Sequence, residues 1–547
     1  MINNQDVKQI EILVSQNQFD SAERLCNQLR EQYPQDIRLI QFLSQIYLMT
    51  GRTEQASSLL QQLFMLDTCN KPLCDYLAQL YGSNKRFDLA SRCYQLYLEN
   101  SPQDGDALYN LAFNQRHAGL FEEAIANYEL ALQAKISQPE EVMLNMAVIY
   151  SDHLHNETRA KTLLQQALDL NSNYVPAMFN LANLYEQSGN RKHAELLFNR
   201  VLEIAPNHFA ALARLADTTI FTQPDCALIV KMQSALTRDD VELSVKIDLL
   251  YGLGKAFNDC QDYTRAFNYY KQANQLNRQE QTDYNPRLFA TKVDLIKSRF
   301  TQSWHEHTHT ELNYQPVFIC GMFRSGSTLV EQILAAHPAI EPGGELEFFV
   351  RKVAGELSPF PEAIAQLNKT QCEELARQYI QYIEQRFSGG GLVTDKRSDN
   401  FLYVGLILSL FPKAKIIFTE RNPLDNCLSV YFQRLGQSMN YATDLKHISH
   451  YYSQQKKLMD YWQSMFPGSV FVCNYDELVK QPELNIRELL AFLELDWSPD
   501  CLHFYRLNNS VKTASVWQVR QPLYVSSSGR WQNFKNDIPD LIQYFED

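Results

Sequence analysis

Long apolar runs, paired cysteines and an excess of positive charge are all missing from this sequence. No apolar stretch reaches about 18 residues, so no membrane span is expected. The 11 cysteines are scattered without a CxxC pair, as in a reduced chain whose cysteines are small core residues. The net charge of −13 argues against nucleic-acid binding, which usually needs a basic face. The first residues show no basic region followed by an apolar run, so we expect a cytoplasmic location.

The 547 residues, of which 45% are hydrophobic, are enough for more than one domain with a sizeable core. In the first part of the chain alanine recurs every 34 residues or close to it, at Ala22, Ala56, Ala90, Ala124, Ala160 and Ala194. Small residues stand 12 positions before several of these anchors and aromatic residues stand 9 before them; examples are Ala78 and Tyr81. Gly254 and Phe257 keep the same two offsets from Ala266.

This periodicity is identified as the tetratricopeptide repeat (TPR), in which each unit is a helix–turn–helix that buries its apolar face only by stacking. We expect an all-α TPR solenoid over residues 1–216. Residues 217–311 are expected to form an irregular helical connector with a further TPR-like hairpin at about 244–277, then a linker. The concave face of such an array predicts binding of a protein or peptide; a rigid spacer or a dimerisation surface stays open, and so does the oligomeric state.

A phosphate-binding loop is predicted where the short apolar run of Val317 to Cys320 leads into Gly321-x4-Gly326 and then into a helical pattern. Strand, glycine turn and helix N-terminus together place backbone N–H groups and a helix dipole against an anion. Ser327 stands where a nucleotide hydrolase carries the lysine that neutralises a triphosphate, and Arg324 brings a cation into the loop. An anionic nucleotide other than ATP is therefore predicted.

The loop Arg324-Ser325-Gly326-Ser327-Thr328-Leu329 resembles the 5′-phosphosulfate loop of sulfotransferases, which use 3′-phosphoadenosine 5′-phosphosulfate (PAPS). His337-Pro338 and Gly343-Gly344-Glu345 fit the protein-tyrosine sulfotransferase branch. The resemblance extends from near Gln315 to the C-terminus, and the sulfotransferase domain is expected over residues 312–547. It implies an α/β, P-loop-like, three-layer domain with a central parallel sheet, PAPS as co-substrate and no metal.

The resemblance also implies the roles of individual residues. Glu345 matches the catalytic base, and a base is needed because a hydroxyl is a weak nucleophile while it is protonated. His337 is a weaker rival, read as a helix-end residue that packs or caps. Lys396, at the end of a predicted strand, matches the lysine that supports the sulfuryl group and the leaving phosphate oxygen. Arg324 and Ser515 are expected to stabilise charge around the transferred group.

The nucleotide itself is expected to be held by a larger set. These residues are Arg324, Ser325, Gly326, Ser327 and Thr328 of the loop, then Arg421, Ser429, Tyr475, Ser515 and Arg530. Arg421 and Ser429 match the motif for the 3′-phosphate. The family has a further arginine four residues beyond that serine; here Gln433 holds the position and Arg434 follows it. Either residue is open as the group that completes this site.

The sequence therefore predicts sulfuryl transfer from PAPS to an acceptor hydroxyl, with peptidyl tyrosine favoured and the TPR array recruiting the protein substrate. A glycan, lipid or small-molecule acceptor stays open. From other classes, a P-loop kinase and an inert TPR scaffold are the alternatives. Ser327 in place of lysine argues against the kinase, and the intact set of Arg324, Glu345, Lys396 and Arg421 argues against the inert scaffold. The histidines of segment 304–309 are read as a solvated linker in preference to a metal site.

Overall fold

The computed structural model describes residues 2–34, 36–154, 156–387, 389–507, 509, 511, 513 and 516–546. Two compact units are distinguished, Met1–Leu181 and Ala182–Asp547, and each is described by itself. The domain boundaries predicted after residues 216 and 311 stay a prediction.

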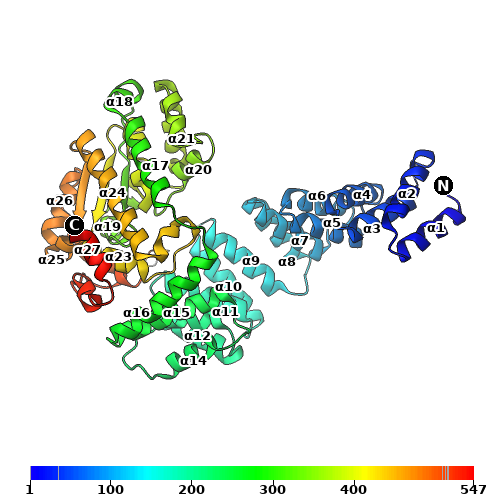
Figure 1. The fold of residues 1–547 in the computed structure, drawn as a ribbon, viewed down its shortest axis with the longest axis horizontal. Coiled ribbons are helices and arrows are strands. Elements are labelled where there is room, and N and C mark those ends of the chain that lie inside the picture. Colours follow the sequence, from blue (N-terminus) through cyan, green and yellow to red (C-terminus); the bar gives the residue numbers. More distant parts are fainter. Residues whose placement is uncertain are drawn as a thin grey trace. The chain divides into compact units, whose positions relative to one another are not determined.

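The first unit is built from consecutive helices that pack as antiparallel pairs (Figure 1). They are α1 (Asn4–Ser15), α2 (Phe19–Gln32), α3 (Ile37–Met49), α4 (Thr53–Leu66), α5 (Lys71–Ser83), α6 (Phe87–Leu98), α7 (Gly105–His117), α8 (Phe121–Gln133), α9 (Pro139–Asp152) and α10 (Glu157–Leu170). The alanine anchors of this unit are all fully buried. A methyl group is the largest side chain that lets two helices approach this closely, so the 34-residue spacing has a packing origin.

More helical hairpins belong to the second unit. Helix α11 (Val175–Gln187) spans the boundary, and α12 (Arg191–Ile204), α13 (Phe209–Thr218), α14 (Ala227–Leu236), α15 (Leu243–Asp259) and α16 (Tyr263–Asn277) follow. The hairpin of α15 and α16 packs directly on the α/β part of this unit. Tyr270 stacks on Phe432 with ring centroids 4.1 Å apart, and the Asn274 amide donates to the carbonyl of Tyr431.

A five-stranded parallel sheet forms the centre of the second unit, in the order β2-β3-β1-β4-β5. The strands are β1 (Val317–Gly321), β2 (Ile340–Pro342), β3 (Leu392–Lys396), β4 (Lys415–Glu420) and β5 (Val470–Asn474). Alternate residues of β1 enter two different cores: Phe318 and Cys320 face one, and Val317 and Ile319 face the other. The sheet is therefore buried on both faces, which confirms the predicted three-layer α/β architecture.

The helices of this part are α17 (Pro286–Arg299), α18 (Gln302–Thr308), α19 (Ser327–Ala335), α20 (Phe348–Ala354), α21 (Lys369–Glu384), α22 (Val404–Leu410), α23 (Pro423–Tyr431), α24 (Leu445–Met465), α25 (Tyr475–Lys480), α26 (Pro482–Phe492) and α27 (Pro539–Glu546). Residues of α22 and α24 share the core of Phe318 and Cys320, and residues of α19 and α26 share the core of Val317 and Ile319, so helices cover both faces of the sheet. None of the helices in the described ranges is long and apolar enough to cross a membrane.

The histidine segment differs from the solvated linker that its sequence suggested. Residues Gln302–Thr308 form α18, whose N-terminus is capped by the Thr301 hydroxyl. His305 contacts the Ser409 hydroxyl at 2.9 Å and stacks against His309. Threonine is a favoured N-cap residue, and the Thr301 hydroxyl accepts from the backbone N–H of Trp304 at 3.2 Å, so this segment begins as a helix.

Candidate active site

Every strand of the sheet delivers a side chain to one pocket at its carboxyl end. Arg324 follows β1, Glu345 follows β2, Lys396 ends β3, Arg421 follows β4 and Tyr475 follows β5; all five line the same pocket. Gly326, Ser327 and Thr328 of the predicted loop also line it. Strands β3 and β4 lie on opposite sides of β1, so the pocket opens where the strand order reverses, which is where open α/β sheets bind ligands.

The loop after β1 has the backbone shape of an anion cradle. Arg324 takes a left-handed conformation with φ +68°, which is uncommon for a residue with a side chain and is concentrated at functional sites. Gly326 has φ +105°, and a Cβ there would lie 2.7 Å from the Tyr475 ring. The Ser325 hydroxyl lies 2.6 Å from the Thr419 hydroxyl in the interior, so Ser325 ties the loop to β4 and does not line the pocket.

Arg324 and Arg421 bring two guanidinium groups close together. Nη1 of Arg421 donates to the carbonyl oxygen of Arg324 at 3.4 Å. Burial and the neighbouring charges of Arg421 and Arg530 lower the pKa of Arg324 to about 10. Like charges held together in this way are stabilised by a bound anion, so this end of the pocket is built for negative charge.

Arg421 is itself incompletely satisfied. The residue is 8% exposed, its guanidinium lies 4.8 Å from the centre of the Tyr475 ring, and Nη2 donates to the carbonyl of Ser527. Its Nε finds no hydrogen-bond partner among the described residues. Leaving a buried charged donor unpaired is costly, and an anionic ligand would remove that cost. The residues present therefore fit a phosphate-bearing ligand.

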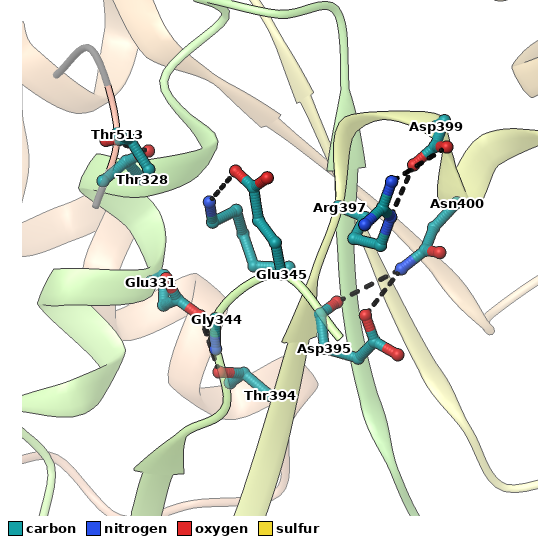
Figure 2. Close-up of polar contacts among 11 residues, drawn as sticks. Thr328, Glu331, Gly344, Glu345, Thr394, Asp395, Arg397, Asp399, Asn400 and Thr513 are labelled. Atoms are coloured by element: carbon teal, nitrogen blue, oxygen red, sulfur yellow. Dashed lines mark hydrogen bonds and ion pairs between the residues drawn. The ribbon is translucent and has the colours of Figure 1, made fainter. Parts of the chain in front are cut away.

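Glu345 and Lys396 form an ion pair at the other side of the pocket, with Nζ 2.7 Å from Oε1. Glu345 is labelled in Figure 2. The Lys396 side chain is 3% exposed and that of Glu345 is 47% exposed. The carboxylate therefore faces the solvent-accessible pocket while the ammonium lies beneath it. A proton acceptor and a fixed cation in contact are the groups that hydroxyl activation and leaving-group stabilisation require.

Ser429 and Arg530 are not among the described residues that line this pocket. Ser429 accepts a hydrogen bond from Nε of Arg324, which does line it, at 3.2 Å. Arg530 donates to Asn258 at 2.9 Å. Ser515 lies outside the described residues. His337 contacts the backbone at Ala339 and Asp496, as expected of a residue that caps a turn, and does not line the pocket.

Arg434 does not complete the phosphate site. Its guanidinium lies 2.8 Å from Asp248 and 2.8 Å from Glu280, and it also donates to the carbonyl of Ser244. These partners belong to α15 and the turn after α16. The arginine beside Gln433 therefore anchors the helical hairpin to the α/β part.

Several pocket residues had no signal in the sequence. Tyr524 and Ser527 line the pocket from the C-terminal segment. The buried carboxylate of Asp425 accepts from the backbone N–H groups of Gly529 (2.6 Å) and Trp531 (2.7 Å), and so holds this segment against α23. More than 100 residues separate Asp425 from these partners, and no local pattern reveals such a contact.

Fold and site define an α/β protein whose anion pocket combines a phosphate-type loop, three cations and a carboxylate. Residues 316–499 match the family model described as "Sulfotransferase family", and tetratricopeptide-repeat models match residues 13–68, 77–139, 155–217 and 247–280. The chain therefore carries a sulfotransferase-family domain together with tetratricopeptide repeats. Among the described residues, no group of His, Cys, Asp or Glu side chains is arranged to hold a metal ion.

Three similar proteins illustrate the range of sequence identity and coverage. An uncharacterized protein of Aquifex aeolicus (strain VF5) is 27% identical over 539 residues; the alignment spans 94% of this chain and just under two thirds, 66%, of that protein. A putative protein-tyrosine sulfotransferase of Caenorhabditis briggsae is 24% identical over 196 residues, which are 35% of this chain and 70% of that protein. The solved sulfotransferase domain from the curacin biosynthetic pathway is 17% identical with a TM-score of 0.31, covering 40% of this chain and 90% of that domain.

Proposed function

We propose that this protein transfers a sulfuryl group from PAPS to the hydroxyl of a tyrosine in a protein substrate. The observation that carries the proposal is the gathering of Arg324, Lys396 and Arg421 with Glu345 around one pocket. The sulfotransferase-family match over residues 316–499 supports the reaction class. The likeness to a putative protein-tyrosine sulfotransferase supports tyrosine as the acceptor.

Different residues would bind the 5′-phosphosulfate and the 3′-phosphate of PAPS. The loop of Arg324 to Thr328 and the N-terminus of α19 would hold the 5′-phosphosulfate. Arg421 would hold the 3′-phosphate, because its Nε has no hydrogen-bond partner in the described part of the chain and its guanidinium lies over the Tyr475 ring. Arginine suits this task because its planar fork donates two parallel hydrogen bonds to a phosphate.

The reaction is a substitution at sulfur. The tyrosine oxygen forms a new S–O bond while the bond between sulfur and the 5′-phosphate oxygen breaks, and the electron pair of that bond leaves with adenosine 3′,5′-bisphosphate. The phenolic proton passes to the Glu345 carboxylate. Negative charge grows on the departing phosphate oxygen, and the buried ammonium of Lys396 is placed to stabilise it.

The proposed role of the TPR helices is to recruit the protein substrate. A repeat array that binds an extended segment of a protein raises the effective concentration of the attached tyrosine at the pocket. The array would therefore lower KM for a protein substrate without changing the chemical step.

Transfer from radiolabelled PAPS tests the donor and the acceptor together. The full chain is incubated with a tyrosine-containing peptide, a cell lysate, and glycan and lipid fractions, with and without Mg²⁺ and with Glu345→Ala in parallel. Mg²⁺-independent labelling of tyrosine that the variant lacks is the expected result. Labelling confined to glycan or lipid would overturn the acceptor, and selective binding of ATP over adenosine 3′,5′-bisphosphate would overturn the donor in favour of a kinase.

A further inference from the structure

Glu331 is a buried acid that no step of the proposed reaction uses. It lies on α19, directly after the phosphate loop, and is 5% exposed. Burial raises the pKa of its carboxyl group, and the charge of Lys396 acts in the opposite direction. A carboxyl group is rarely buried unless its hydrogen-bonding capacity is used, so its contacts indicate why it is there.

Those contacts lead to the loop that carries the candidate base and to the strand that carries the candidate cation. Oε1 of Glu331 accepts from the backbone N–H of Gly344 at 3.0 Å and from the Thr394 hydroxyl at 3.1 Å (Figure 2). Gly344 is the residue before Glu345, and Thr394 lies on β3 two residues before Lys396. One side chain on the phosphate-loop helix thus contacts both the loop of the candidate base and the strand of the candidate cation.

Hydrogen bonds fix the peptide groups on both sides of Gly344. Its N–H donates to Glu331, and its carbonyl oxygen accepts from the backbone N–H of Lys396 at 2.8 Å. Gly343 approaches β3 so closely that a Cβ there would lie 2.2 Å from the Thr394 carbonyl oxygen. Gly344 itself has φ +66°, a left-handed conformation that a glycine adopts without strain. The backbone of Glu345 is therefore fixed from α19 and from β3.

We propose that Glu331 is a positioning residue that sets the backbone of the Glu345 loop against Lys396 by accepting the hydrogen bonds of Gly344 and Thr394. This inference rests on the proposed function for its catalytic consequence, while its structural part does not. Loss of the side chain would leave the part-buried N–H of Gly344 and the buried hydroxyl of Thr394 without this acceptor and would free the loop. Displacement of a base by about 1 Å is enough to lower a rate substantially.

Three variants separate positioning from general stability. Glu331→Ala removes the acceptor, and Glu331→Gln retains a carbonyl oxygen that can accept from the same two donors. Gln332→Met is the matched control, because Gln332 is the next residue of α19, is 3% exposed, and its Oε1 has no hydrogen-bond partner in the described part of the chain. Each variant is measured by amide hydrogen exchange, by calorimetric binding of adenosine 3′,5′-bisphosphate, and by transfer from PAPS to a tyrosine-containing peptide.

Exchange at the Gly344 amide is expected to be about tenfold faster in Glu331→Ala, which is the effect of losing one buried hydrogen bond. In the same variant kcat should fall by about tenfold or more while the Kd of the bisphosphate changes by less than about threefold. Glu331→Gln should recover both the exchange rate and most of kcat, and Gln332→Met should resemble the wild type.

Unchanged exchange at Gly344 in Glu331→Ala would overturn the inference. So would a Kd that rises in proportion to the fall in kcat, or a Glu331→Gln variant as impaired as Glu331→Ala. If the wild type labels no peptide, the proposed acceptor fails on its own, and the exchange and binding measurements still decide whether Glu331 holds the loop.

Discussion

The ammonium of Lys396 lies 2.7 Å from Oε1 of Glu345, so the candidate cation and the candidate base are in direct contact. Lys396 is enclosed and Glu345 is half exposed, which leaves the carboxylate as the member of the pair that can reach an acceptor. A bound donor would give the ammonium a second anionic partner. The ammonium of Lys396 can therefore exchange its contact with Glu345 for a contact with the donor as charge moves from the acceptor to the leaving group.

Replacing Glu345 by Gln should abolish proton acceptance while preserving size and hydrogen bonding. We expect kcat to fall by about 100- to 10,000-fold, the usual contribution of a general base. Binding of adenosine 3′,5′-bisphosphate should stay within about threefold, because Arg324 and Arg421 still face the nucleotide. Transfer from radiolabelled PAPS measures kcat, and calorimetry measures binding of the bisphosphate.

Glu347 offers a matched control for this experiment. It lies two residues further on and pairs with Arg351 at the surface. Glu347→Gln should leave both kcat and nucleotide binding near the wild-type values, because an exposed ion pair contributes little. Equal loss of nucleotide binding and of rate in Glu345→Gln would remove the support for Glu345 as the base.

Arg421 and Arg434 form a second matched pair. Arg421→Ala should weaken binding of adenosine 3′,5′-bisphosphate by about 10- to 100-fold, since charged hydrogen bonds are lost. It should weaken AMP binding much less, because AMP lacks the 3′-phosphate. The ratio of the two dissociation constants, measured by calorimetry, reports the 3′-phosphate contact alone.

Arg434→Ala should give the opposite pattern. It removes contacts with Asp248 and Glu280, so the urea midpoint of unfolding should fall by an amount equivalent to about 1 kcal/mol or more. The preference for the bisphosphate over AMP should be retained. A collapse of that preference in Arg434→Ala, with none in Arg421→Ala, would reverse the assignment made here.

Short sequence patterns predicted the helical hairpins and the strand, loop and helix around Gly321, because interactions between residues close in the sequence form these elements. The 34-residue spacing of Ala22 and its counterparts predicted helical hairpins, since only small residues fit where two helices touch. The apolar run before Gly321 predicted a strand, a loop and a helix. Lys396 and Arg421 line the same pocket because the carboxyl ends of parallel strands meet at one edge of the sheet. Their roles in binding stay predictions.

Contacts between distant residues could not be predicted in the same way. The partners of Arg434 lie more than 150 residues earlier in the chain, and the motif alone left open whether Gln433, which holds the position, or Arg434 beside it completes the site. The link from Glu331 to Gly344 looks short in sequence, but it depends on how β2 is placed beside β3. A helical glutamate reads as a surface residue until the sheet order is known.

Asp395 gives a prediction for the dependence of stability on pH. It is 1% exposed, its Oδ1 accepts from Asn400 at 3.0 Å, and its Oδ2 has no hydrogen-bond partner among the described residues. Burial raises its pKa to about 8, against about 4 in an unfolded chain. Between these values the folded state holds a proton that the unfolded state releases, so this group lowers the free energy of unfolding as pH rises.

Asp395→Asn removes that titration. Its stability relative to the wild type should increase steadily from about pH 4 to about pH 8 and then level off. Urea unfolding at about pH 5, 6.5 and 8 measures the difference, and comparing the two proteins cancels the titration of groups they share. Nearby charges of Arg397, Asp399 and Glu331 act on the same carboxyl group. Parallel pH profiles for variant and wild type would contradict the prediction.

Gly254 tests the contact between the last helical hairpin and the α/β part of the same unit. A Cβ at this position would lie 2.6 Å from two carbon atoms of the Tyr270 ring, and Tyr270 is stacked on Phe432. The ring is buried and cannot move without disturbing that stack. Gly254→Ala should therefore destabilise the protein by about 1–3 kcal/mol, as overpacked interiors do, although alanine is the better helix former.

Gly436 provides the control in the same unit. Its φ of −75° suits any residue, and a Cβ there would meet nothing within 4 Å. Gly436→Ala should raise stability by a few tenths of a kcal/mol to about 1 kcal/mol, because it restricts only the unfolded chain. Thermal unfolding followed by circular dichroism compares the two. If Gly254→Ala shifted the midpoint upward as Gly436→Ala does, the hairpin would not be packed on the α/β part through Tyr270 and Phe432, and the anchoring assigned to Arg434 would need another explanation.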